Sequence, residues 1–113
     1  MADLKNYIPE IIESLKKIDP IKVILFGSVA KDNQTEYSDL DIVVIIDIEG
    51  LPRNFEDRLA NKILVRNAIL DLSFEVPIDL LVYTIKEFSL LQENNKPFAS
   101  EINNGKVLYE KAG

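Results

Sequence analysis

The pattern of apolar positions predicts an amphipathic helix near the start of the chain. Apolar residues recur there at intervals of three and four, the spacing of one helical face: Leu4, Ile8, Ile11, Ile12, Leu15 and Ile18. Pro9 suits only a first turn, so the helix begins near Ile8 or a short turn precedes it, and Pro20 ends it. The compact apolar run 21–26 that follows, bounded by Gly27, predicts a buried strand.

Three later runs are typical of strands. A run rich in β-branched residues over 39–47 follows a polar loop at 32–36, and a second run over 78–84 follows Pro77. A short run over 107–109 predicts a closing strand. Because these runs alternate with helical periodicity, they predict a sheet packed against helices.

A long second amphipathic helix is predicted over 55–72, with Asn54 as its N-cap. Its apolar stripe is expected to face the core: Phe55, Leu59, Ile63, Leu64, Ala68 and Leu72. Two shorter helices are expected, one over 85–92 and one that begins near Pro97 and ends before Gly105. The order of elements indicates an α/β (α+β) fold with a small mixed sheet backed by helices, in one domain over 1–113.

Small and acidic residues gather around the first two predicted strands. Gly27-Ser28 follows the first strand, and Asp39 and Asp41 open the second. Residues two apart on a strand point to the same face, so the two carboxylates lie side by side. Asp79 stands at the head of the apolar third strand, where an ionised carboxylate is costly to bury unless it is paired or bound to a metal. Hard oxygen ligands beside a turn with free backbone N–H groups suit a magnesium-bound triphosphate.

The composition removes most other kinds of chemistry. The 113 residues include no His and no Cys, so a thiolate nucleophile, a zinc ribbon and an imidazole base are all excluded. The net charge of −6 argues against nucleic acid as the main partner. The chain lacks an apolar run of membrane-spanning length and a signal-peptide core at its N-terminus, so we expect a cytoplasmic protein with no membrane partner.

Nucleotidyl transfer would use every one of these groups. Two Mg²⁺ ions about 3.5–4 Å apart neutralise the developing charge and require convergent carboxylates. Asp39 and Asp41 would supply two of these, and Asp79 would be the third ligand and a candidate general base for the attacking hydroxyl. Gly27 and Ser28 would hold the phosphates, because glycine allows a phosphate close to the backbone.

The arrangement Gly27-Ser28, ten residues, Asp39-Leu40-Asp41, with Asp79 on a later strand, resembles the DNA polymerase β-like nucleotidyltransferase superfamily. The chain is most similar to its minimal nucleotidyltransferase branch, the MNT or MntA-type proteins. The resemblance implies that Gly27 and Ser28 bind phosphate and that the three aspartates bind metal.

Ser38 and Lys31 stand at two further positions of the family pattern. Ser38 matches the serine that usually precedes the first aspartate, and the resemblance places it in the nucleotide-binding part of the site. Members often carry Ala-Arg-Gly after the Gly-Ser turn, where this chain has Ala30-Lys31-Asp32. Lys31 keeps the charge but loses the planar two-point phosphate contact of arginine, so it is either a phosphate contact or an exposed helix residue.

The resemblance also implies a fold and a partner. The fold would have helices on one side of the sheet and an open nucleotide cleft on the other. ATP would be the AMP donor, and the acceptor would be a tyrosine of an all-helical HEPN-domain toxin, which the chain would counteract as an antitoxin. Two alternatives stay open: a module that blocks its partner without turnover, and a small-molecule nucleotidyltransferase of the antibiotic-modifying type that acts as a homodimer.

Simpler interpretations apply to the remaining polar residues. Asp47 shares strand parity with Asp39 and Asp41, but it lies at the far end of the run and is interpreted as a solvated strand terminus. The four tyrosines are interpreted as residues at the margin of the core.

Overall fold

A mixed four-stranded sheet forms the centre of the molecule, in a computed structural model that describes residues 3–33, 35 and 38–112. Its strands are β1 (Lys22–Phe26), β2 (Leu40–Ile46), β3 (Ile78–Thr84) and β4 (Lys106–Glu110), in the order β3-β2-β1-β4. β1 runs antiparallel to β2 and β4, whereas β2 and β3 are parallel. The predicted α+β class with a small mixed sheet is therefore confirmed.

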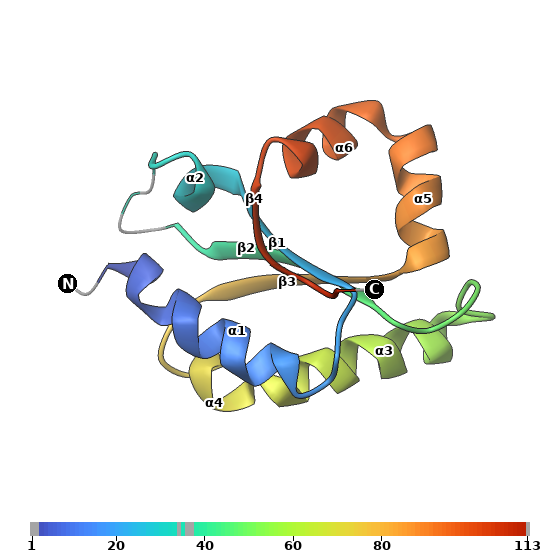
Figure 1. Ribbon diagram of the computed structural model, residues 1–113, viewed down its shortest axis with the longest axis horizontal. Coiled ribbons are helices and arrows are strands. Elements are labelled where there is room, and N and C mark those ends of the chain that lie inside the picture. Colours follow the sequence, from blue (N-terminus) through green and yellow to red (C-terminus); the bar gives the residue numbers. More distant parts are fainter. Residues whose placement is uncertain (1–2, 34, 36–37, 113) are drawn as a thin grey trace.

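Helices cover both faces of the sheet (Figure 1). One face carries α1 (Ile8–Lys16), α3 (Phe55–Ala68) and α4 (Leu70–Ser73), and the other carries α5 (Ile85–Asn94) and α6 (Lys96–Asn103). The chain also forms a 3₁₀ turn before α1 (Leu4–Tyr7) and one helical turn after β1, α2 (Gly27–Ala30). No helix in the described part of the chain is long and apolar enough to cross a membrane.

The expectation of helices on one face only is wrong. Phe88 of α5 packs against Tyr83 of β3. Phe98 and Ile102 of α6 belong to the same cluster as Ile24 and Phe26 of β1. The ring of Phe26 meets that of Phe98 edge to face, with centroids 6.0 Å apart. The second face is therefore covered in part, and any open site lies beside α6.

β2 is buried on both faces, as its nearly continuous apolar run indicates. Its side chains alternate between the two cores: Ile42 and Val44 face α1 and α3, whereas Val43 and Ile45 face α5 and α6. The same parity places Asp41 on the face of α5 and α6, the face that Phe26 also occupies. The strand thus anchors a carboxylate at the edge of a rigid core.

The first helix follows its sequence pattern closely. A short turn precedes Ile8, which is one of the two starts that Pro9 allowed. Ile11 and Leu15 are fully buried. The helix ends at Lys16, before Asp19 takes a positive φ of 52° and turns the chain toward Pro20.

The second long helix differs from its prediction in two ways. It breaks at Ile69, so α3 ends at Ala68 and a separate turn, α4, follows. Its expected core stripe is largely on the surface, since Phe55 is 74% exposed and Leu59 and Ile63 are 43% exposed each. Ala68 and Leu72, at the end of the expected stripe, do reach the core, but Val65 and Ile69, which lie outside it, supply the rest of the contact. The sequence carries two apolar stripes at helical spacing, and periodicity alone does not show which one faces the sheet.

Candidate active site

Gly27 forms the turn between β1 and α2. Its φ is +77°, in the left-handed region that favours glycine. A Cβ at this position would lie 2.1 Å from Oδ2 of Asp41, well inside any allowed contact. Glycine is therefore required both by the backbone and by the carboxylate that lies against the turn.

Asp41 and Asp79 form the centre of the site. They are register partners on the parallel strands β2 and β3, so their side chains share one face of the sheet. Burial, followed by the charges of Asp79 and Asp39, raises the pKa of Asp41 from 3.8 to about 6, and a hydrogen bond with Asp79 and the charge of Glu101 add to the rise. Two carboxylates in contact repel each other when both are ionised, so this pair favours a shared proton or a cation.

Asp39 is exposed and lies just before β2, which begins at Leu40. The charge of Asp39 raises the pKa of Asp41 from a distance, whereas Asp79 also shares a hydrogen bond with Asp41. Within residues 3–33, 35 and 38–112, no three acidic side chains are gathered tightly enough to hold a metal ion. The donor set nevertheless fits Mg²⁺ in kind, since it consists of carboxylate oxygens, and a cation would relieve the repulsion between Asp41 and Asp79.

Ser28 and Ser38 are joined across the turn. The Ser28 hydroxyl donates a hydrogen bond to Oγ of Ser38 over 3.0 Å, and the same oxygen accepts the backbone N–H of Thr35 over 2.8 Å. Ser38 thus ties the segment before β2 to the Gly27 turn. The structure brings together Gly27, Ser28, Ser38 and Asp41 as the sequence predicts, but it commits the Ser28 proton to Ser38.

Lys31 points to α6. Its Nζ lies 3.3 Å from Oε1 of Glu101, and both side chains are exposed. Glu101 is a functional candidate that sequence reasoning missed, because its place beside Asp41 depends on how α6 packs and no local pattern signals it. Asp32, where the family pattern has glycine, takes a φ of 60° and pairs with Lys5. Aspartate tolerates this backbone conformation better than most residues, so the turn keeps its shape.

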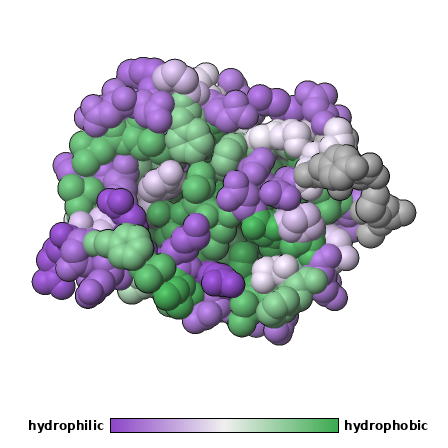
Figure 2. All heavy atoms as spheres, turned by 180° about the vertical axis from the view of Figure 1, so that it is seen from behind, coloured by the Kyte–Doolittle hydropathy of each residue, from purple (hydrophilic) through white to green (hydrophobic). Residues whose placement is uncertain are grey.

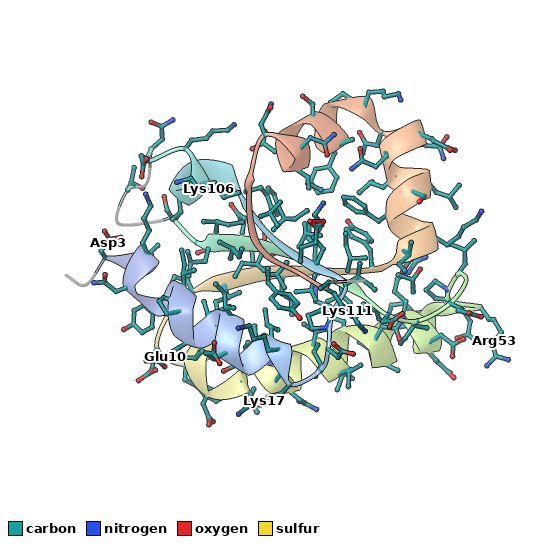
Figure 3. The ribbon with its side chains drawn as sticks, in the orientation of Figure 1. Asp3, Glu10, Lys17, Arg53, Lys106 and Lys111 are labelled. Atoms are coloured by element: carbon teal, nitrogen blue, oxygen red, sulfur yellow. The ribbon has the colours of Figure 1, made fainter. Side chains whose placement is uncertain are left out.

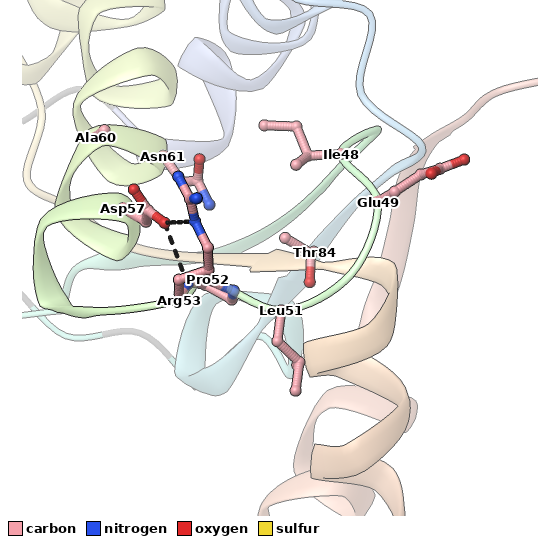
Figure 4. Close-up of a pocket in the computed structure, with 9 residues that line it drawn as sticks. All are labelled: Ile48, Glu49, Leu51, Pro52, Arg53, Asp57, Ala60, Asn61 and Thr84. Carbon is pink, nitrogen blue, oxygen red and sulfur yellow. Dashed lines mark hydrogen bonds and ion pairs between the residues drawn. The ribbon is translucent and has the colours of Figure 1, made fainter.

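A different cavity lies at the opposite end of the sheet (Figure 4). It has a volume of about 370 Å³ and is lined by Ile48, Glu49, Thr84 and the start of α3. In the wall of this cavity, Nε of Arg53 donates a hydrogen bond to Oδ2 of Asp57 over 3.2 Å. Hydrogen bonds from the backbone and the side chain of Arg53 lower the pKa of Asp57. Ile48 follows the end of β2 and Asp41 lies near its beginning, so this cavity is separate from the carboxylate site.

A glycine turn against a pair of strand-borne carboxylates, on a small mixed sheet, defines the nucleotidyltransferase class. A family model described as "Nucleotidyltransferase domain" matches residues 8–104, and the chain belongs to this family. The chain is 30% identical over 112 residues to the Methanocaldococcus jannaschii protein "Putative protein adenylyltransferase MJ1305", a match that covers 96% of this chain and 73% of that one.

Solved structures share the fold. One is a "putative nucleotidyltransferase" from Sulfolobus solfataricus, with a TM-score of 0.58 and 18% identity over 96% of this chain and 80% of that one. Another is a toxin–antitoxin crystallised with AMP-PNP, with a TM-score of 0.57 and 20% identity over 92% of this chain and 73% of that one. The family resemblance drawn from the Gly27-Ser28 and Asp39-Leu40-Asp41 motifs is confirmed, and the protein is a nucleotidyltransferase enzyme.

Proposed function

We propose that this enzyme transfers AMP from ATP to a hydroxyl, in a reaction that depends on Mg²⁺. The contact between Asp41 and Asp79 carries the proposal, because two carboxylates in contact beside a glycine turn, one of them with a raised pKa, form a place where a cation would relieve their repulsion. The relative named as an adenylyltransferase and the neighbour crystallised with an ATP analogue support ATP as the donor.

Each site residue has a separate role in this proposal. Gly27 allows the triphosphate close to the backbone, and Ser28 and Ser38 hold the turn in place until the Ser28 hydroxyl exchanges its acceptor, Oγ of Ser38, for a phosphate oxygen. Lys31 exchanges its partner Glu101 for a phosphate oxygen. Asp39, Asp41 and Asp79 would hold two Mg²⁺ ions, which when bound would neutralise the triphosphate and polarise the α-phosphate.

The bond changes are those of any AMP transfer to a hydroxyl, and the aspartates are assigned to them. The acceptor oxygen attacks the α-phosphorus, the bond from that phosphorus to the bridging oxygen breaks, and pyrophosphate leaves. Asp79 takes the acceptor proton, since it is the exposed member of the pair and stands on the edge strand where an acceptor has access. Asp41, which is half-buried, stays in place as a ligand.

The acceptor in this proposal is a tyrosine of an all-helical HEPN-domain toxin, and the chain is its antitoxin. A structural neighbour is a toxin–antitoxin complex, which supports a toxin as the partner. A phenolic hydroxyl on a folded partner would have to approach Asp79 from outside the sheet. The outer edge of β3 is open to such an approach because β3 is the last strand of the sheet.

Transfer assays with matched variants test the proposal. The purified chain is incubated with [α-³²P]ATP, MgCl₂ and the product of the adjacent gene, beside the Asp39→Asn/Asp41→Asn double variant and an Asp47→Asn control. We expect labelled partner with the wild type and the control and none with the double variant or with EDTA. Partner inhibition that survives in the double variant would favour a blocking module instead, and transfer that survives there would refute the roles of the aspartates.

A further inference from the structure

The surface of α3 carries two parallel rows of side chains. One row is apolar and consists of Phe55, Leu59 and Ile63, spaced four residues apart and exposed to solvent. The other is basic and consists of Arg58, Lys62 and Arg66, with the same spacing. Residues four apart lie on one side of a helix, so each row is continuous. Seen from behind, hydrophobic side chains gather across the middle and along the lower margin of the molecule, with hydrophilic ones between them (Figure 2).

The basic row lies on the side of α3 that faces β3. Arg58 reaches Glu87 over 3.6 Å and lines a cavity of about 470 Å³ with Val82 and Tyr83 of β3. Lys62 and Arg66 line a second cavity, of about 240 Å³, together with Ile78, Asp79 and Leu80. The row therefore runs along the open edge of the sheet, and its last two members share a cavity with Asp79, whose own side chain lies on the face of α5 and α6.

Lys62 and Arg66 are available for an outside partner. Both are exposed, and neither forms an ion pair with any residue that the structure describes. The chain as a whole carries a net charge of −6. Lys62 and Arg66 therefore form a local positive patch on a protein that is negative overall. Paired with the apolar row, they fit a surface that offers acidic side chains at the edge of an apolar face.

We propose that the α3–β3 surface, made of these two rows and the outer edge of β3, docks an amphipathic, acidic segment of a partner protein and brings its hydroxyl to Asp79. The apolar row contacts the apolar side of the segment, and Lys62 and Arg66 contact its carboxylates. An antiparallel two-fold contact through α3 would place the two basic rows side by side, which favours a separate acidic partner over a second copy of the chain. The inference rests on the proposed function, since it names the partner chemistry of the same site.

Three fluorescent peptides test the docking surface by anisotropy. All are amphipathic helices with one tyrosine: the first has a leucine face bordered by glutamates, the second has lysines for glutamates, and the third has serines for leucines. The net charge of the chain alone predicts that the lysine peptide binds more tightly. The local rows predict that the glutamate peptide binds about tenfold more tightly than either of the others.

Matched double variants separate the local charges from the general ones. Lys62→Glu/Arg66→Glu should reverse the preference between the glutamate and lysine peptides. Lys17→Glu/Lys106→Glu makes the same change of charge at the end of α1 and on β4, and it should leave the preference unchanged (Figure 3). Three results would each overturn the inference: equal effects of the two double variants, tighter binding of the lysine peptide by the wild type, or failure of the glutamate peptide to bind.

Further variants test the apolar row of α3 and separate docking from transfer. Leu59→Ser/Ile63→Ser should weaken binding of the glutamate peptide, whereas Val107→Ser, an exposed apolar position on β4, should not. Self-association that Leu59→Ser/Ile63→Ser abolishes would assign the surface to a second copy and overturn the proposal.

The Asp39→Asn/Asp41→Asn variant should bind the glutamate peptide normally, because its changes lie in the active site and not on the docking surface. Docking without any transfer would therefore refute the proposed function alone, and transfer that Lys62→Glu/Arg66→Glu leaves unchanged would refute the docking surface alone.

Discussion

Replacing Asp41 by Asn should stabilise the metal-free protein at neutral pH while abolishing its activity. The pKa of Asp41 rises from 3.8 to about 6 on folding, chiefly through burial and the charge of Asp79. Ionised Asp41 is therefore less favourable in the folded chain than in the unfolded one. The shift corresponds to about 3 kcal/mol, which screening by solvent at this half-buried side chain reduces to about 1–2 kcal/mol. An amide of the same shape removes this penalty and donates to Asp79.

The sign of the pH dependence follows from the raised pKa. Between about pH 4 and pH 6 the folded state holds more protons than the unfolded state, so the Asp41 contribution lowers stability as pH rises through that window. Above it the penalty stays constant. The difference in unfolding free energy between Asp41→Asn and wild type should therefore be near zero at pH 4 and grow to about 1–2 kcal/mol by pH 7.

Urea unfolding at pH 4, 5, 6 and 7, with EDTA and constant ionic strength, measures this difference. The wild type and Asp41→Asn are compared at each pH, so titration of all other groups cancels to first order. A variant that is less stable than wild type at pH 7, or a difference that does not change between pH 4 and pH 7, would refute the reasoning.

Three further predictions concern the fold and the site. Gly27→Ala should cost at least about 1–2 kcal/mol through its left-handed backbone alone, and it should displace Asp41, so urea unfolding and ATP-analogue binding should both weaken. Ser38→Ala removes the acceptor of two hydrogen bonds and should lower the unfolding free energy by about 1 kcal/mol, a loss that Ser38→Thr should restore in part. Leu59→Ser should change stability by less than about 0.5 kcal/mol although it lies in the expected core stripe, whereas Val65→Ala should cost about 1.5–3 kcal/mol; equal costs in thermal or urea unfolding would contradict the placement of α3.

Local patterns predicted the strands and the groups that they carry. The apolar runs of β1 and β2 are long enough to identify buried strands. The two-residue period predicted Asp39 and Asp41 on one strand face, whereas β2 begins at Leu40, so it carries Asp41 and leaves Asp39 just before it. The expectation that Asp79 joins the other two carboxylates came from the cost of burying a charge at the head of an apolar strand. Its direct contact with Asp41 depends on the parallel register of β2 with β3, which the sequence does not display.

Features that depend on packing between distant segments were not predictable. α5 and α6 return over the second face of the sheet, and this brings Glu101 near Asp41 and Lys31. The apolar row on α3 has the spacing of a core stripe, but Val65 and not Leu59 faces the sheet. Periodicity fixes the spacing of residues on a helix, whereas the choice of the buried face is made by the elements that pack against it.

The position of the label in ATP tests the central claim most directly. Parallel reactions contain [α-³²P]ATP or [γ-³²P]ATP with MgCl₂ and the helical partner, and the labelled protein is counted after separation. Nucleotidyl transfer predicts label from the α-phosphate only, with one pyrophosphate released for each AMP transferred. Label from the γ-phosphate, or the same α-label with Asp39→Asn/Asp41→Asn as with the wild type, would contradict the account.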